Sequence, residues 1–147
     1  MAKDFTIVVV RHAEKAVAES DPALNSKGKQ RAQLLAEMLS KLDLEAVYST
    51  PFQRTEQTAQ PVAKRFDLAV QNYKAGDGEV LVEKLLAAEQ TALVVGHSNT
   101  VPGIVGALGV EVESMTEKEY GDVFLLHFRD GQPRLHRLMI PMIEEKE

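Results

Sequence analysis

The chain lacks several features that would assign it to other classes of protein. It contains no cysteine, which excludes disulfide bonds, thiolate metal sites and cysteine nucleophiles. It has no apolar run long enough to cross a membrane, and no signal-peptide segment precedes the first apolar run, so we expect a cytoplasmic protein. A formal net charge of -5 argues against a nucleic-acid surface or a basic membrane-binding face.

The composition is that of an ordinary globular protein. The 147 residues are 44% hydrophobic and 27% charged, which suits a chain that folds around one sizeable core. We find no internal repeat, no low-complexity segment and no composition break that would mark a linker. The sequence therefore predicts a single domain over residues 1–147.

Two apolar runs end abruptly at polar side chains. Residues 6–10 (TIVVV) stop at the pair Arg11 and His12, and residues 91–95 (TALVV) stop just before a glycine and His97. Runs without polar alternation are typical of strands buried on both faces of a parallel sheet. Ligands of open α/β sheets bind beyond the carboxyl ends of such strands. If the two strands are neighbours, both imidazoles meet in one pocket.

Periodicity and turn signals predict the remaining elements. Further strands are expected over 44–49 and 68–73, and helices over 52–66, 80–88 and 101–108, besides a first helix capped by Asn25 or Ser26 that continues to Leu42. Pro61 should kink or restart the second helix. Ser98 or Asn99 should cap the fourth. A loop is expected over 16–24, a turn over 75–78, a turn-rich segment over 113–120 and a frayed end over 144–147.

The order of these elements predicts an α/β fold. We expect a three-layer sandwich with a mostly parallel central sheet, helices on both faces and an antiparallel C-terminal hairpin. Asp130-Gly131 between residues 122–128 and 134–140 indicates the hairpin. For His12 and His97 to meet, the first and fourth strands must be adjacent, with the second and third on one side and the hairpin on the other. That adjacency is a topological switch point, where a ligand crevice is expected.

Arg54 supports the same pocket. It falls in the first turn of the predicted helix that follows the second strand, where a positive charge opposes the helix dipole unless an anion compensates. His127 and His136 lie within the predicted hairpin without such neighbours. We expect these two histidines to be structural or surface residues.

The sequence resembles the histidine phosphatase superfamily, also called the phosphoglycerate mutase-like family. The matching residues follow the first, second and fourth predicted strands: Arg11-His12, then Ser49-Thr50-Pro51 with Arg54-Thr55 and Gln57-Thr58-Ala59, then Gly96-His97-Ser98. The spacing of Leu24, Gly28 and Arg31-Ala32 is also similar to that of the family. The resemblance covers about the first two-thirds of the chain.

The resemblance implies a phosphoryl-transfer pocket in which His12 is transiently phosphorylated. It also implies that Arg11, Arg54 and His97 bind the phosphoryl oxygens, with Ser98 as a further phosphate-binding candidate. An imidazole attacks phosphorus near neutral pH without prior deprotonation. Two guanidiniums supply planar donors for the developing charge, so we expect neither a metal nor a cofactor.

Some positions depart from the family pattern. The larger members often carry glycine where Ala13 stands, and the mutases have a longer insertion and an asparagine where this chain has Ala18. These differences argue against mutase activity, and the compact size resembles the phosphohistidine phosphatases. The proton donor for the leaving group is left open between Glu79, after the third predicted strand, and Glu14, two residues beyond the nucleophile.

These observations predict a metal-independent phosphatase. Its substrate is expected to be a phosphorylated small molecule or a phosphohistidine protein, and inorganic phosphate is the product. The alternative is a non-catalytic, phosphate-dependent binding or regulatory module. The presence of a nucleophile favours the enzyme, because binding alone does not require one. The loops that shape selectivity carry no motif that identifies the substrate.

Overall fold

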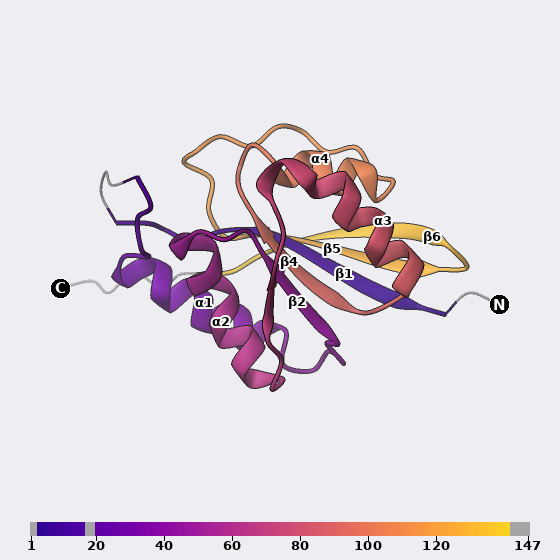
Figure 1. Ribbon diagram of the computed structural model, residues 1–147, viewed down its shortest axis with the longest axis horizontal. Coiled ribbons are helices and arrows are strands. Elements are labelled where there is room, and N and C mark those ends of the chain that lie inside the picture. Colours follow the sequence, from indigo (N-terminus) through magenta and orange to yellow (C-terminus); the bar gives the residue numbers. More distant parts are fainter. Residues whose placement is uncertain (1–2, 17–19, 142–147) are drawn as a thin grey trace.

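The structure is a computed structural model that describes residues 3–16 and 20–141. Within these ranges the chain forms one sheet in the order β3-β2-β4-β1-β5-β6, with α1 and α2 on one side and α3 and α4 on the other (Figure 1). The elements are β1 (Phe5–Arg11), α1 (Ser26–Met38), β2 (Ala46–Ser49), α2 (Gln53–Arg65), β3 (Val70–Asn72), the 3-10 turn η1 (Ala75–Asp77), α3 (Gly78–Ala88), β4 (Ala92–Gly96), α4 (Val101–Ala107), β5 (Asp122–Arg129) and β6 (Gln132–Met139). The predicted frayed end at 144–147 and part of the predicted loop over 16–24 lie outside the described residues.

The strand order is the one that the sequence predicts. β1 pairs in parallel with β4 and in antiparallel with β5, while β2 pairs in parallel with both β3 and β4. β5 and β6 form the antiparallel hairpin, and Asp130 and Gly131 at its turn have φ values of 52° and 76°, which the tight turn requires. The three-layer α/β fold is therefore confirmed.

The core lies on both faces of β1. Ile7 and Val9 pack toward α3 and α4, whereas Val8 and Val10 pack toward α1 and α2. Every residue of β1 is buried as a result. An uninterrupted apolar run is what such a strand needs, since neither of its faces contacts water.

Several helix boundaries differ from the predictions. Asn25 caps α1 as expected, with its side chain accepting a hydrogen bond from Gly28, but α1 ends at Met38 and Leu42 lies beyond it. α2 begins at Gln53, because the preceding Phe52 keeps an extended backbone. α3 begins at Gly78, directly after η1. The described helices include none that is long and apolar enough to cross a membrane.

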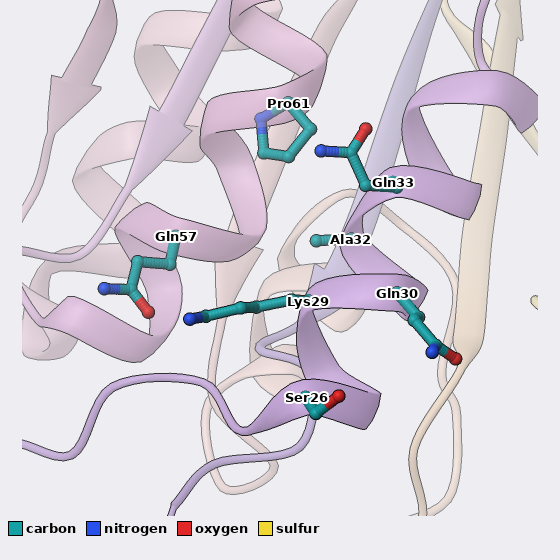
Figure 2. A pocket seen from close by; sticks show the side chains of 7 residues that line it. All are labelled: Ser26, Lys29, Gln30, Ala32, Gln33, Gln57 and Pro61. Carbon is teal, nitrogen blue, oxygen red and sulfur yellow. The ribbon is translucent and has the colours of Figure 1, made fainter.

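Pro61 does not restart α2, which continues to Arg65. A proline at this position removes the N–H that would bond to the carbonyl of Gln57. Both residues line an open groove of about 510 Å³ between α1 and α2, where Pro61 lies across from Gln33 (Figure 2). The opposite face of α2 is buried against the sheet, and this packing outweighs one lost hydrogen bond.

Candidate functional site

The two histidines meet at the carboxyl edge of the sheet. Arg11 at the end of β1 pairs with Gly96 at the end of β4, and the backbone N–H of His12 donates to the Gly96 carbonyl at 2.9 Å. The ring centroids of His12 and His97 are 5.6 Å apart. Only 4% of His12 and 7% of His97 is exposed. The predicted meeting of the two imidazoles is confirmed.

His12 is held in one tautomer. Its Nδ1 lies 2.8 Å from the carbonyl oxygen of Ala13, and because a carbonyl only accepts, Nδ1 carries the proton. The Nε2 of the neutral ring therefore presents a lone pair, with Nη2 of Arg11 at 3.5 Å. Burial lowers the pKa of His12 to about 3, and the charges of Arg11 and Arg54 act in the same direction. The ring is thus neutral at pH 7, with its nucleophilic nitrogen unprotonated.

Residues at α1 and α2 hold the backbone that follows His12 in place. The N–H of Ala13 donates to the Thr58 hydroxyl at 2.9 Å, and the N–H of Asn25 donates to the Glu14 carbonyl at 3.0 Å. Gly28 of α1 approaches so closely that a Cβ at this position would lie 2.0 Å from the Glu14 oxygen. Only glycine permits this contact. The loop that carries His12 therefore cannot move independently of α1.

Glu14 is engaged in a buried ion pair. Arg31 donates from Nε and Nη2 to the two carboxylate oxygens of Glu14, both at 2.8 Å, and from Nη1 to the Ile140 carbonyl. Burial alone would raise the pKa of Glu14, but the hydrogen bonds from Arg31 outweigh it and the pKa is lowered. The carboxylate stays ionised and tied to α1, which leaves it no proton to give to a leaving group.

Arg11 anchors the segment between α4 and β5. Its Nη1 donates to the carbonyls of Thr116, Glu117 and Glu119 at 3.3, 3.0 and 2.8 Å. The ring of Tyr120 stacks on the guanidinium at 4.1 Å. Nε of Arg11 is buried and lacks a hydrogen-bond partner among the described residues. One edge of the guanidinium therefore holds the loop, and the other edge faces His12. The sequence contains no local signal for the contact between Arg11 and this loop.

Arg54 reaches the site from the first turn of α2. Its guanidinium stacks on the Phe52 ring at 4.8 Å, and the same ring contacts His97 edge-on at 5.3 Å. Its charge helps to lower the pKa values of both histidines. The structure thus brings Arg54 to the residues of the β1 and β4 edges. Phe52 and Tyr120 form aromatic walls that sequence reasoning did not identify.

His97 is held from both its ring and its backbone. Its Nε2 lies 2.8 Å from the Thr50 hydroxyl, and its backbone N–H donates to the Thr100 hydroxyl at 3.0 Å. Burial lowers the pKa of His97 to about 4, assisted by the charges of Arg54 and Arg11. Thr100, not Ser98 or Asn99, precedes α4, so the predicted cap is wrong. The turn that closes back onto the His97 carbonyl delays the helix to Val101.

Glu79 lies beside the His97 loop and forms no ion pair with another described residue. It is exposed in the first turn of α3 and lines a groove of about 210 Å³ together with Asn99 and Thr100. Ser98 is half-buried at the start of the same loop. In the part of the chain that the structure describes, no three histidine, aspartate or glutamate side chains are close enough to share a metal ion.

Part of the chain is similar in sequence to known proteins. The family model of the histidine phosphatase superfamily (branch 1) matches residues 7–75. Phosphoserine phosphatase 1 of Hydrogenobacter thermophilus is 38% identical over 71 residues, which are 44% of this chain and 34% of that protein. The match therefore spans about a third of the length of this curated relative.

Solved structures share the fold over nearly the whole chain. The protein histidine phosphatase SixA, complexed with tungstate, superposes with a TM-score of 0.77 at 23% identity, covering 92% of this chain and 97% of that one. A phosphoserine phosphatase of Entamoeba histolytica in complex with phosphoserine gives a TM-score of 0.69 at 17% identity, covering 89% and 94%. At these identities the likeness shows the fold.

Proposed function

We propose that this chain belongs to the histidine phosphatase superfamily, whose family model matches residues 7–75, and that it is a phosphatase that passes a phosphoryl group through His12. The observation that carries the proposal is the tautomer of His12. Its Nδ1 proton is committed to the Ala13 carbonyl, so the Nε2 lone pair is available next to two guanidiniums. A binding site for phosphate requires the cations but not this nucleophile.

In the first step, Nε2 of His12 attacks the phosphorus atom. A bond forms between Nε2 and phosphorus while the bond from phosphorus to the leaving group breaks. Charge on the equatorial oxygens is met by Arg11, Arg54 and His97, whose positions are set before substrate arrives. Ser98 is a further candidate donor to these oxygens. Because the donors are preorganised, little reorganisation is needed as charge develops.

The leaving group takes a proton from Glu79 in this proposal. Glu79 is exposed beside the His97 loop, whereas the ion pair with Arg31 keeps Glu14 deprotonated. In the second step the Glu79 carboxylate accepts a proton from water, the water oxygen attacks phosphorus, and the bond to His12 breaks. Inorganic phosphate leaves and His12 returns to its neutral form.

The substrate is a phosphorylated small molecule or a phosphohistidine protein. The curated relative named for phosphoserine and the SixA structure named for protein histidine support these two classes. The absence of mutase activity, the independence of metals and a cytoplasmic location remain predictions. The alternative function is a non-catalytic module that binds phosphate.

A chromogenic aryl phosphate assay in excess chelator tests the proposal. We expect turnover that the chelator does not change, together with an acid-labile, base-stable phosphoryl group trapped on the protein by rapid quenching. Binding of inorganic phosphate without turnover of any phosphorylated compound in a metabolite and phosphohistidine panel would favour the binding module. Loss of activity in chelator would show that a metal is required.

A further inference from the structure

Two threonines extend from His97 into the protein. The hydroxyl of Thr50 lies 2.8 Å from Nε2 of His97 and 2.8 Å from the hydroxyl of Thr55. Both threonines are fully buried. They lie behind the imidazole, so their hydroxyls do not serve as phosphoryl ligands. We call this series His97, Thr50 and Thr55 the hydroxyl relay.

Each hydroxyl has one proton, and this fixes which group donates each hydrogen bond of the relay. The Thr55 oxygen lies 2.9 Å from the Thr50 carbonyl and 3.0 Å from the Phe52 carbonyl. Carbonyls only accept, so the single hydroxyl proton of Thr55 is committed to them. The Thr50 hydroxyl must then donate to Thr55. Having one proton, it can only accept from His97, and Nε2 is therefore the protonated nitrogen of the neutral ring.

We propose that Thr50 and Thr55 are positioning residues that fix His97 as its Nε2–H tautomer, so that Nδ1 binds an oxyanion only after taking up a proton. This inference deepens the proposed function and rests on the phosphoryl site. Among the described residues, Nδ1 of His97 has no hydrogen-bond partner, and Nε of Arg11 is the one side-chain atom that is both fully buried and unpaired. Nδ1 of His97 is therefore partly exposed. It is therefore the nitrogen that an anion in the site can reach.

The surroundings of His97 favour the uptake of a proton by its ring only when an anion is present. Arg11 and Arg54 carry positive charge toward the ring, His12 beside it is neutral, and the relay side contributes uncharged hydroxyls. In the free protein these groups and the burial of the ring oppose a second proton. A dianion placed among the same groups offsets both guanidinium charges and accepts a charge-assisted hydrogen bond from a protonated Nδ1, which favours the imidazolium. Anion affinity should therefore fall as the pH rises.

Without the relay, the proton requirement disappears. In Thr55→Ala, the Thr50 hydroxyl loses its acceptor and is free to donate to Nε2. The neutral ring then carries its proton on Nδ1 and donates to an oxyanion directly. Thr55→Ser is the matched control, because it keeps the hydroxyl and its two carbonyl acceptors. A purely structural role for Thr55 would not exchange one tautomer for the other.

Nitrogen NMR of the free protein at pH 7 reads the tautomer without any turnover. We expect a protonated Nε2 and an unprotonated Nδ1 for His97 in the parent and in Thr55→Ser, and a shift toward protonated Nδ1 in Thr55→Ala. A parent protein with Nδ1–H would overturn the inference. Because this measurement needs no substrate, it tests the tautomer even if the proposed phosphatase activity is not found.

Calorimetry with sulfate measures the proton uptake itself. Sulfate remains a dianion at pH 6, so a proton taken up goes to the protein, and two buffers of different ionisation enthalpy reveal the number. We expect about one proton per sulfate in the parent and Thr55→Ser, and less than about half a proton in Thr55→Ala. The relay would be contradicted if the parent took up no proton, or if all three proteins took up the same number of protons. If sulfate does not bind, the phosphoryl site fails and the NMR result alone decides the tautomer.

Discussion

Two histidine and threonine pairs lie at opposite ends of the sheet, in very different surroundings. At the carboxyl edge, Nε2 of His97 lies 2.8 Å from the Thr50 hydroxyl. At the other end, Nδ1 of His127 lies 3.0 Å from the Thr6 hydroxyl. The His97 pair is buried among cations, whereas the His127 side chain is 45% exposed with Nε2 3.9 Å from an Asp4 carboxylate oxygen. The same two groups thus belong to the proposed anion site at one end and to a solvated surface at the other.

The comparison shows that burial and neighbouring charge, rather than the residue pair, make a site. A histidine that faces a carboxylate and water, as His127 does, offers an anion no neighbouring cations. A histidine buried between arginines is kept neutral until an anion arrives. The predictions below contrast the two regions, beginning with the largest expected effect.

Replacement of the proposed nucleophile should give the largest difference in activity between the two ends of the sheet. His12→Ala should lower kcat on an aryl phosphate by about 10,000-fold or more, because the covalent step is lost. Sulfate affinity should persist, since the arginines supply most of the attraction. The matched change His127→Ala should leave kcat within about twofold. Near-parental turnover of His12→Ala would show that another group is the nucleophile.

Removal of a site cation should have the next largest effect. Arg54→Ala should lower kcat/KM by about 100-fold or more and weaken inhibition by phosphate, because its contacts strengthen as charge develops. Arg134→Ala removes an exposed cation of β6 and serves as the control. Steady-state kinetics with phosphate as inhibitor measure both variants. Equal effects of the two changes would mean that long-range charge, and not placement, governs the site.

Two glutamates of contrasting burial test how the His12 loop is held. Glu14→Gln leaves Arg31 buried without its charge partner, which should cost about 3–5 kcal/mol in the free energy of unfolding. Glu37→Gln breaks the exposed pair with Arg65 and should cost less than about 1 kcal/mol. Urea unfolding measures both. A small cost for Glu14→Gln would contradict a rigid attachment of the loop to α1.

The lowered pKa values at the carboxyl edge predict a pH dependence of stability. In the unfolded chain a histidine has a pKa of about 6.5, whereas the pKa values of His12 and His97 in the folded protein are about 3 and 4. Below pH 6.5 the unfolded state binds more protons, so stability should fall as the pH drops toward these values. The variant His12→Asn should show a shallower fall between pH 6.5 and 4. An unchanged slope in urea unfolding across this range would contradict the neutral buried ring.

The sequence by itself determined where the strands and the hairpin lie, and it gave the strand order on the condition that His12 and His97 meet. Residues 7–10 and 92–95 contain no polar side chain, which suits a strand covered on both faces. The pair Asp130-Gly131 supplies the positive φ values of a tight hairpin. These signals are local, because apolar periodicity and turn chemistry depend on residues within one element. The polar residues that follow each strand then had to share one edge of the sheet.

Tertiary structure alone decided which contacts each side chain at that edge makes. The sequence left Glu14 and Glu79 as rival acids, and the partner that distinguishes them, Arg31, lies 17 positions from Glu14. Arg11 binds carbonyls more than 100 positions away, and Thr50 meets His97 across 47 positions. Such contacts depend on how separate elements pack and on which loop covers the edge. Burial and proton positions at the site follow from that packing, so no pattern confined to one segment of the chain encodes them.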